Sequence, residues 1–402
     1  MHKRWFFISL AFLGILINFF DRSALGYAIE PIKASFNLNN TQFGLIASAF
    51  AVGYTLLVIF TGHWIDLLGS RRIWFAGAIL WSIFMILLGL ASGFWWLYCL
   101  RFLLGAAETC SFTGLTKVSA SWLAPSERAW GLALGLAAVP FASVLGAPLI
   151  SSLIIAWGWR GGFITLGLMG IVWGIIWAIC YREPIRHDQI AFKTPDISTF
   201  SWKEILFNPR LMSNNYAFFS FGYLLYFAIT WLPGYFEQTY GLHLKQIGWF
   251  LVVPWVFATI TILLGGLFSD YLWRKTSSLR LARSHMIWIS QIIAACCFIP
   301  VIFIHSVNVA LTFITLGIGF GLLPNAAFYA LHVDLMPSRA ATSLAVMSCA
   351  FGLAGLLATG LTGWLTTITN NFNAAIWLLI FFTITSAIGI IIFQRNFSSE
   401  KN

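Results

Sequence analysis

The sequence predicts an all-α integral membrane protein in which twelve transmembrane helices form two halves of six helices each. The first observation behind this prediction is composition: 59% of the 402 residues are hydrophobic and only 9% are charged. A soluble domain has about a quarter of its residues charged. The second observation is that apolar runs recur along the whole chain. Each run is long enough, at ~18 residues or more, to cross a hydrocarbon core of ~30 Å.

The third observation is the distribution of positive charge, which gives the chain a formal net charge of +10. Lysines and arginines gather in alternate loops and in the tails, while the opposite loops hold only Lys33, Arg160 and Lys245. This positive-inside pattern predicts that both termini lie in the cytoplasm. The charge therefore indicates topology, and no nucleic-acid partner is expected. Short loops and an uncleaved first apolar run predict a multi-pass protein of the inner (plasma) membrane.

The apolar runs place six predicted spans in each half. In the first half these are residues 5–29, 41–62, 73–93, 95–118, 129–155 and 162–181, and in the second half 212–236, 246–267, 283–304, 308–331, 340–364 and 374–394. A polar stretch with three prolines separates the two groups. We therefore predict an N-terminal half over residues 1–181, a cytoplasmic linker over 182–210 and a C-terminal half over 211–402.

A loop motif follows the second span of each half. The first copy reads G-x-x-x-D-x-x-G-x-R-R from Gly62 to Arg72, and the second places Asp270 before Arg274. Six spans, a linker and six more spans with the same loop are the pattern of parallel repeats in major facilitator transporters. The first copy resembles the signature loop of that superfamily, which acts as a gate latch between the halves. The gating residues that we predict are Gly62, Asp66, Gly69, Arg71, Asp270 and Arg274.

The motif departs from the family pattern at one position. The family normally has a basic residue directly after the aspartate, and this chain has Leu67 there. The latch is therefore expected to be weaker. The alternative is that the glycines, the aspartate and the flanking arginines only mark the cytoplasmic side of the membrane.

Four charged residues lie inside the apolar runs: Asp21 and Arg22 in the first span, and Arg101 and Glu108 in the fourth. A charge at the bilayer centre costs ~2.5–3.5 kcal/mol on insertion scales, so such residues usually face a cavity and carry function. Counting ~1.5 Å of rise per residue, the two arginines come to a similar depth. A guanidinium fits a carboxylate or phosphate, so the cluster predicts an anion site beside proton acceptors. The alternative is two ion pairs that only hold helices together.

With these residues, the chain resembles the anion:cation symporter family within the major facilitator superfamily. The stretches that carry the resemblance are Asn18-Phe19-Phe20-Asp21-Arg22, Arg101-Phe102-Leu103-Leu104-Gly105 with Glu108, Gly158-Trp159-Arg160, Tyr181-Arg182-Glu183-Pro184, and Tyr226 with Thr230-Trp231-Leu232-Pro233. The resemblance implies that Arg22 and Arg101 bind an organic anion and that Asp21 and Glu108 take part in proton coupling. It also implies that Tyr54, Tyr223 and Tyr226 lie near the central cavity, although ordinary packing is an equal alternative for these tyrosines.

The substrate is less closely implied. The family often has asparagines in the fifth and eleventh spans, where this chain has Leu136, Ser348 and Gly352. Fewer amides leave fewer hydrogen bonds for a polyhydroxylated sugar acid, so we expect a less hydroxylated carboxylate or a larger carboxylate siderophore. Ser348 stays a candidate for binding the substrate. Asn325 follows Pro324, where a kink would leave it as a donor to the cavity.

The predicted function is secondary active transport, by alternating access, of a small organic anion in symport with protons. The alternative is an exporter or antiporter of a metabolite, siderophore or drug with the same fold. A receptor is disfavoured because the linker and tails are too short for a signalling domain, and no nucleophile–base pair indicates an enzyme. The chain has no Walker motif, so the proton gradient is the expected energy source, with no cofactor and no metal. The expected partners are the anion, protons and the lipid bilayer, and we expect a monomer.

Overall fold

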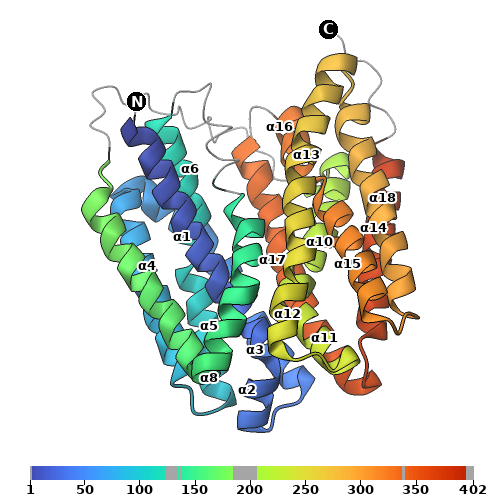
Figure 1. Cartoon of the computed structure of the whole chain (residues 1–402). Helices are drawn as coiled ribbons and strands as arrows, with labels where there is room; N and C mark the ends of the chain where they lie inside the picture. Colours follow the sequence, from blue (N-terminus) through green and yellow to red (C-terminus); the bar gives the residue numbers. More distant parts are fainter. Residues whose placement is uncertain (1, 124–134, 136, 184–205, 337–339, 395–402) are drawn as a thin grey trace. The chain divides into compact units, whose positions relative to one another are not determined.

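The computed structural model describes residues 2–123, 135, 137–183, 206–336 and 340–394 (Figure 1). Every regular element in this part of the chain is a helix. In chain order the helices are α1 (His2–Tyr27), α2 (Ile29–Phe36), α3 (Asn40–Leu68), α4 (Ser70–Gly89), α5 (Phe94–Ala107), α6 (Cys110–Trp122), α8 (Ala138–Cys180), α10 (Pro209–Thr230), α11 (Leu232–Tyr240), α12 (Leu244–Phe250), α13 (Val252–Thr276), η2 (Arg280–Ser284), α14 (His285–Val301), α15 (Val307–Leu322), α16 (Asn325–Leu335), α17 (Ala340–Thr369) and α18 (Asn373–Phe393).

The predicted all-helical membrane fold is confirmed. Within the described residues, nine helical segments are long and apolar enough to cross a membrane, or ten if the bent pair α10 and α11 forms one span. Those two helices meet at an angle of 56°. One segment, α8, has 43 residues and covers the predicted span 162–181 except for its last residue, together with part of 129–155. The total of twelve spans therefore stays a prediction.

Two predicted spans are broken in their middle. The span predicted over 95–118 is divided into α5 and α6, and Glu108 lies at the C-terminal end of α5. The span predicted over 308–331 is divided into α15 and α16 at Pro324, as the predicted kink requires. Proline has no N–H to donate to the preceding turn, so a helix breaks or kinks there.

The Gly158-Trp159-Arg160 stretch forms a turn inside α8. Gly158 has a φ of +67°, a backbone conformation that is open to glycine and costly for most other residues. Beyond this turn, Arg160 Nη1 donates hydrogen bonds to the carbonyl oxygens of Gly89 and Ala91, at 3.1 and 2.7 Å. Gly89 is the last residue of α4 and Ala91 lies two residues beyond it. The last carbonyl groups of a helix have no partner within the helix. The stretch therefore ties α8 to the end of α4.

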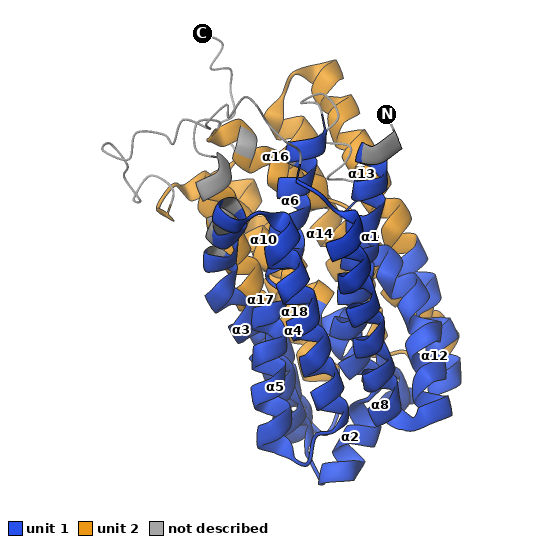
Figure 2. Cartoon of the chain, turned by 90° about the vertical axis from the view of Figure 1, so that its left-hand side faces the viewer, with its two compact units in different colours: residues 1–185, 226–256, 355–372 blue, residues 186–225, 257–354, 373–402 orange. Residues whose placement is uncertain are grey.

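The chain packs as two compact units (Figure 2). Unit 1 comprises residues 1–185, 226–256 and 355–372, and unit 2 comprises residues 186–225, 257–354 and 373–402. Unit 1 thus contains the first half of the chain together with two segments from the second. The predicted division of the chain by a linker over 182–210 stays a prediction, because residues 184–205 lie outside the described part.

Unit 1 is held by two kinds of close packing. Along α4 and α8, stacked aromatic rings fill the interior, with Trp177 4.2 Å from Tyr181 and 4.6 Å from Trp74 between ring centroids. Elsewhere a glycine lets backbones meet. A Cβ on Gly26 of α1 would lie 2.5 Å from the carbonyl oxygen of Ile229 in α10. Close approach at small residues is how helices commonly associate in membranes.

Unit 2 is packed by aromatic side chains. Phenylalanines of α10 pack on rings of α16 and α17, such as Phe218 on Phe328 and Phe351, with ring centroids 5.4 and 5.5 Å apart.

Candidate substrate and proton site

The first ion pair of the charged cluster joins α1 to the end of α5. Arg22 Nε donates to Glu108 Oε2 at 2.7 Å, and the two side chains are only 6% and 0% exposed. A hydrogen bond between two charged groups is short and strong. The break between α5 and α6 places Glu108 at this point, since it is the C-cap residue directly after α5. The positive charge of Arg22 is therefore neutralised within the protein.

Arg101 lies beside this pair without a partner of its own. Its residue exposure is 5%, yet within the described part of the chain its guanidinium makes no ion pair or hydrogen bond. Its guanidinium carbon is 4.9 Å from the centroid of the Phe50 ring, and that of Arg22 is 5.0 Å from the same ring. The two arginines therefore converge, as the sequence predicts. A buried charge is stabilised by pairing, so Arg101 is the cation that is open to an anionic ligand.

Two further polar residues of α1 face this region. Asp21 and Asn18 are both completely buried, and neither the carboxylate oxygens of Asp21 nor the amide atoms of Asn18 have a hydrogen-bond partner among the described residues. The same holds for Glu108 Oε1 and Arg22 Nη2. Buried polar groups in proteins are nearly always paired, so each exception requires an explanation. Several exceptions in one place are what a site for a polar ligand presents.

Two of the three predicted tyrosines belong to this cluster in unit 1. The ring of Tyr54 on α3 lies 4.9 Å from the guanidinium carbon of Arg22 and is stacked with Phe50 at 6.2 Å. Tyr226 lies close enough to Arg22 and Arg101 to interact with both electrostatically. Asn18 is a member that the sequence analysis did not single out. Its spacing of three and four residues from Asp21 and Arg22 places it on their side of the helix. From this spacing, the sequence alone could have predicted that Asn18 belongs to the site.

The other predicted substrate residues lie in unit 2 and are described there. Tyr223 is buried and packs between Phe219 and Phe382, at 6.2 and 5.1 Å between ring centroids. Asn325 is the first residue of α16, directly after the break at Pro324. The Ser348 hydroxyl donates to the Leu344 carbonyl oxygen of its own helix at 2.9 Å. The proposed contacts of these three residues with a substrate stay predictions.

The predicted gate residues of the first loop lie at the junction of α3 and α4. Gly62 and Asp66 are in α3, and the side chain of Asp66 lies outside the described part of the structure. Gly69 ends α3 with a φ of +83°. The Arg71 guanidinium donates twice to the Ala178 carbonyl oxygen, at 3.0 and 2.6 Å, and the Arg71 N–H donates to Glu183 at 3.1 Å. The loop is thus tied to the end of α8.

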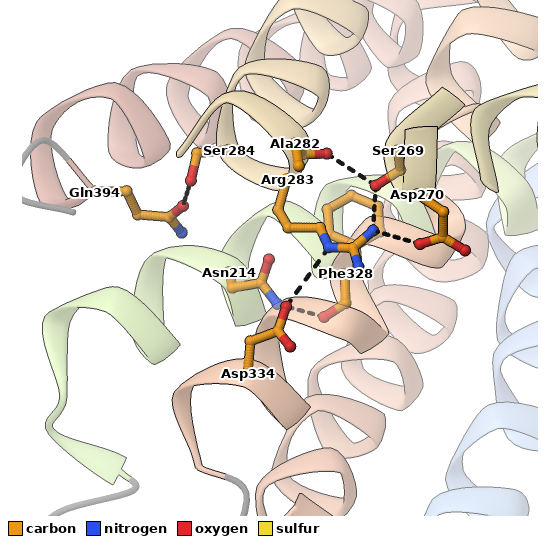
Figure 3. Close-up of polar contacts among 9 residues, drawn as sticks. All are labelled: Asn214, Ser269, Asp270, Ala282, Arg283, Ser284, Phe328, Asp334 and Gln394. Atoms are coloured by element: carbon orange, nitrogen blue, oxygen red, sulfur yellow. Dashed lines mark hydrogen bonds and ion pairs between the residues drawn. The ribbon is translucent and has the colours of Figure 1, made fainter. Parts of the chain in front are cut away.

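The second loop is organised by an arginine that the sequence analysis did not assign (Figure 3). Arg283 of η2 donates from Nη1 to Asp270 at 3.1 Å and to the Ser269 hydroxyl, and its Nε lies 3.5 Å from Asp334 of α16. Arg274 instead donates to the backbone oxygen of Asp270, at 3.3 Å. Burial raises the pKa of Asp334, and the nearby Arg283 opposes that change. The sequence feature that could have drawn attention to Arg283 is its position at the start of the predicted span 283–304.

Replacing Arg283 with alanine is expected to destabilise unit 2. The substitution removes the cation that is shared by Asp270 and Asp334 and leaves the Ser269 hydroxyl without this contact. The Ser269 hydroxyl keeps its hydrogen bond to the Ala282 carbonyl oxygen, but the partly buried carboxylate of Asp334 loses its counter-charge. Such a loss costs about 1–3 kcal/mol, so the midpoint of thermal unfolding of the purified protein should fall. Arg274→Ala is the control, because an exposed side chain contributes within about 0.5 kcal/mol. Equal midpoints for the two variants would contradict the assignment.

Residues 11–359 match the Major Facilitator Superfamily. The chain is 30% identical to the uncharacterized transporter YybO of Bacillus subtilis, over 92% of this chain and 89% of that protein. It is 26% identical to the hexuronate transporter of the same organism, over 96% and 94%. It is 29% identical to the probable galactarate/D-glucarate transporter GudP of Escherichia coli, over 93% and 90%.

Solved structures show the same fold. A bacterial homologue of the human lysosomal transporter Spinster, in an inward-facing and occupied conformation, matches with a TM-score of 0.84 at 18% identity, over 98% of this chain and 97% of that one. The D-xylose-proton symporter matches with a TM-score of 0.77 at 13% identity, over 96% and 97%. The matched proteins are transporters and not enzymes, in agreement with the sequence prediction. The chain belongs to the major facilitator superfamily, in the group of transporters that resembles the anion:cation symporters.

Proposed function

We propose that this transporter moves a small organic anion across the membrane by alternating access, in symport with protons. The observation that carries the proposal is the pairing of charged side chains in the unit 1 cluster. Arg22 is paired with Glu108, whereas Arg101 is buried beside them with no direct ion pair or hydrogen bond among the described residues, and the carboxyl groups of Glu108 and Asp21 attract it only from a greater distance. A substrate carboxylate fits the planar fork of a guanidinium, and it would supply the direct ion pair that Arg101 lacks.

The same geometry supplies a route to proton coupling. A proton that reaches Glu108 removes the negative charge from its pair with Arg22. The released guanidinium lies against the Phe50 ring, as Arg101 does, so both arginines can then hold the anion. One proton thereby adds one cation to the anion site. Asp21, which is buried without a hydrogen-bond partner, is the second candidate for carrying a proton.

The names of the relatives support an anionic substrate. They are transporters of hexuronate, probably galactarate or D-glucarate, and probably sulfoacetate. All of these compounds are small and carry an acidic group that is ionised at neutral pH. Leu136 and Ser348, where the family often has asparagine, favour the less hydroxylated members of the class. The distribution of lysine and arginine supports an orientation with both termini in the cytoplasm.

Uptake into proteoliposomes tests the proposal. The purified protein is reconstituted, and accumulation of radiolabelled D-glucuronate, D-glucarate and sulfoacetate is followed with and without an inward proton gradient. We expect at least one anion to accumulate with the gradient and the accumulation to vanish when a protonophore collapses it. An anion that leaves the vesicles as protons enter would favour the antiporter. Failure of all three anions to respond to the gradient would contradict the proposal.

A further inference from the structure

The guanidinium of Arg22 is surrounded by aromatic rings from three helices. Its guanidinium carbon lies over the rings of Phe19 at 4.7 Å, Phe50 at 5.0 Å, Tyr54 at 4.9 Å and Phe112 at 5.8 Å from the ring centroids. The first ring belongs to α1, the next two to α3 and the last to α6. We call these four rings the aromatic cage. Each lies within the ~6 Å at which a cation is attracted to an aromatic face.

The rings of the cage pack on one another in pairs. Phe19 meets Phe112 edge to face, with ring centroids 6.0 Å apart, and Phe50 stacks on Tyr54 at 6.2 Å. Phe19 and Phe50 are only 5% and 2% exposed, so their rings are fixed in the interior of unit 1. A cation gains more from an aromatic face in such a desolvated place than at the surface. The cage is therefore able to stabilise a buried guanidinium without the help of a carboxylate.

The rings and the Glu108 carboxylate hold Arg22 in different ways. Glu108 accepts a hydrogen bond from Arg22 Nε at 2.7 Å and so occupies a donor of the guanidinium. A ring attracts the positive charge and does not take the place of an oxygen acceptor at the N–H groups. Arg22 Nη2 is buried and has no hydrogen-bond partner among the described residues. Since a guanidinium offers its N–H groups as a planar fork that fits a carboxylate, a guanidinium that is held by rings keeps this fork for a ligand.

We propose that the aromatic cage holds Arg22 in the site as a cation when Glu108 takes up a proton, so that the anion meets a second arginine that is already in place. The inference rests on the proposed function, because it names the residues that position the arginine freed by that proton. The proton comes from the aqueous phase and forms an O–H bond on the Glu108 carboxylate. Arg22 loses no proton and keeps its charge. Phe19, Tyr54 and Phe112 are thus positioning residues that act through Arg22.

Other charged or titratable groups that interact with Glu108 set the background for any pH response. They come from α1, α3, α5, α6 and α10, and they are Asp21, Arg22, Tyr54, Arg101, Cys110 and Tyr226. A test at Phe19 leaves all of these groups unchanged. Phe50 is less suitable for a test, because its ring also lies against Arg101. Within the described part of the chain, the ring of Phe19 has Arg22 as its cation.

Fluorine NMR tests the position of Arg22 without a substrate. 4-Fluorophenylalanine replaces Phe19, and its resonance is compared in the otherwise unchanged protein, in Glu108→Gln, which mimics the neutral acid, and in Arg22→Gln. If the cage holds Arg22, the resonance in Glu108→Gln should stay closer to that of the unchanged protein than to that of Arg22→Gln. A resonance that coincides with that of Arg22→Gln would show that Arg22 leaves the rings, and it would overturn the inference. Arg22→Leu serves as the reference if Arg22→Gln does not fold.

Affinity measurements test what the cage does for the anion. Fluorine atoms on a ring weaken its attraction for a cation and change its size little, so one, two or three of them are introduced at Phe19. The dissociation constants of D-glucuronate, D-glucarate and sulfoacetate are measured at acidic and at neutral pH. The wild type should bind at least one anion more tightly at acidic pH. Three fluorine atoms should reduce this gain by about 2- to 30-fold, the factor that corresponds to one cation–π contact. The affinity at neutral pH should not change, because Glu108 then holds Arg22.

Phe298 supplies the matched control. It is a buried phenylalanine of α14 in unit 2, and no arginine or lysine of the described chain lies over its ring. Three fluorine atoms at Phe298 should leave the gain at acidic pH unchanged, and a stepwise loss at Phe19 alone supports the inference. An equal gain in all of these proteins overturns the role of the cage and leaves proton coupling through Glu108 standing. A wild type that binds none of the anions, or binds them equally at both pH values, overturns both the inference and the assigned role of Glu108.

Discussion

Replacing Arg101 with alanine is expected to abolish binding and transport of the anion. In the structure, Arg101 is the arginine of the cluster that makes no direct ion pair or hydrogen bond among the described residues, so the alanine variant removes the group that the substrate would pair with. Removing one partner of a buried charge pair costs about 2–5 kcal/mol, which is roughly a 30- to 4000-fold weaker dissociation constant. Calorimetric titration of the purified protein with the anion found by the uptake assay measures this loss.

Two variants make the result specific. Arg101→Lys keeps the positive charge but loses the planar fork of donors, so its affinity should lie between those of the wild type and the alanine variant. Arg280→Ala removes an exposed arginine of η2 and should bind the anion like the wild type. If Arg101→Ala also binds with the affinity of the wild type, the four charged residues only hold helices together, and the exporter becomes the better hypothesis.

Adding a single methyl group at Gly105 is expected to cause the largest structural effect. The Cβ of Gly105→Ala would lie 2.1 Å from the Phe50 carbonyl oxygen, and a Cβ at the facing Gly53 would lie 2.0 Å from the Phe102 carbonyl oxygen. Both obstacles are backbone atoms, so no side-chain rotation can relieve the overlap. The helices α3 and α5 must move apart, and overpacking of this kind costs about 1–3 kcal/mol or more.

The consequence should extend to function, because Phe50 is the residue whose ring lies against both Arg22 and Arg101. We expect Gly105→Ala to lower the midpoint of thermal unfolding and to weaken anion binding together. Gly389→Ala in α18 is the matched control, since a Cβ there meets no atom within 4 Å. Its expected effect is slight stabilisation, because alanine favours a helix over glycine by about 1 kcal/mol. Equal midpoints for the two variants would contradict the packing argument.

Much of the candidate site could be predicted from the sequence because charge is rare inside an apolar span. Asp21, Arg22, Arg101 and Glu108 each stand out for that reason, and the structure brings the two arginines to one ring. Asn18 gave a much weaker signal, since an asparagine in an apolar helix is uncharged and costs less to bury. Arg283 was hidden among the loop arginines, because its partners Asp270 and Asp334 come from two other helices. The residues that surround a side chain in the sequence do not determine its interaction partner or how deeply it is buried.

The sequence by itself determined that the chain crosses a membrane as helices and belongs with transporters. A segment in lipid must satisfy its own backbone hydrogen bonds, so hydropathy and charge along the chain are enough to predict helices. Tertiary structure decided which arginine is neutralised and which stays open to a ligand, where the fourth predicted span breaks, and how closely α3 and α5 approach. These features depend on distances between atoms of different helices, and the spacing of residues within one helix does not fix those distances.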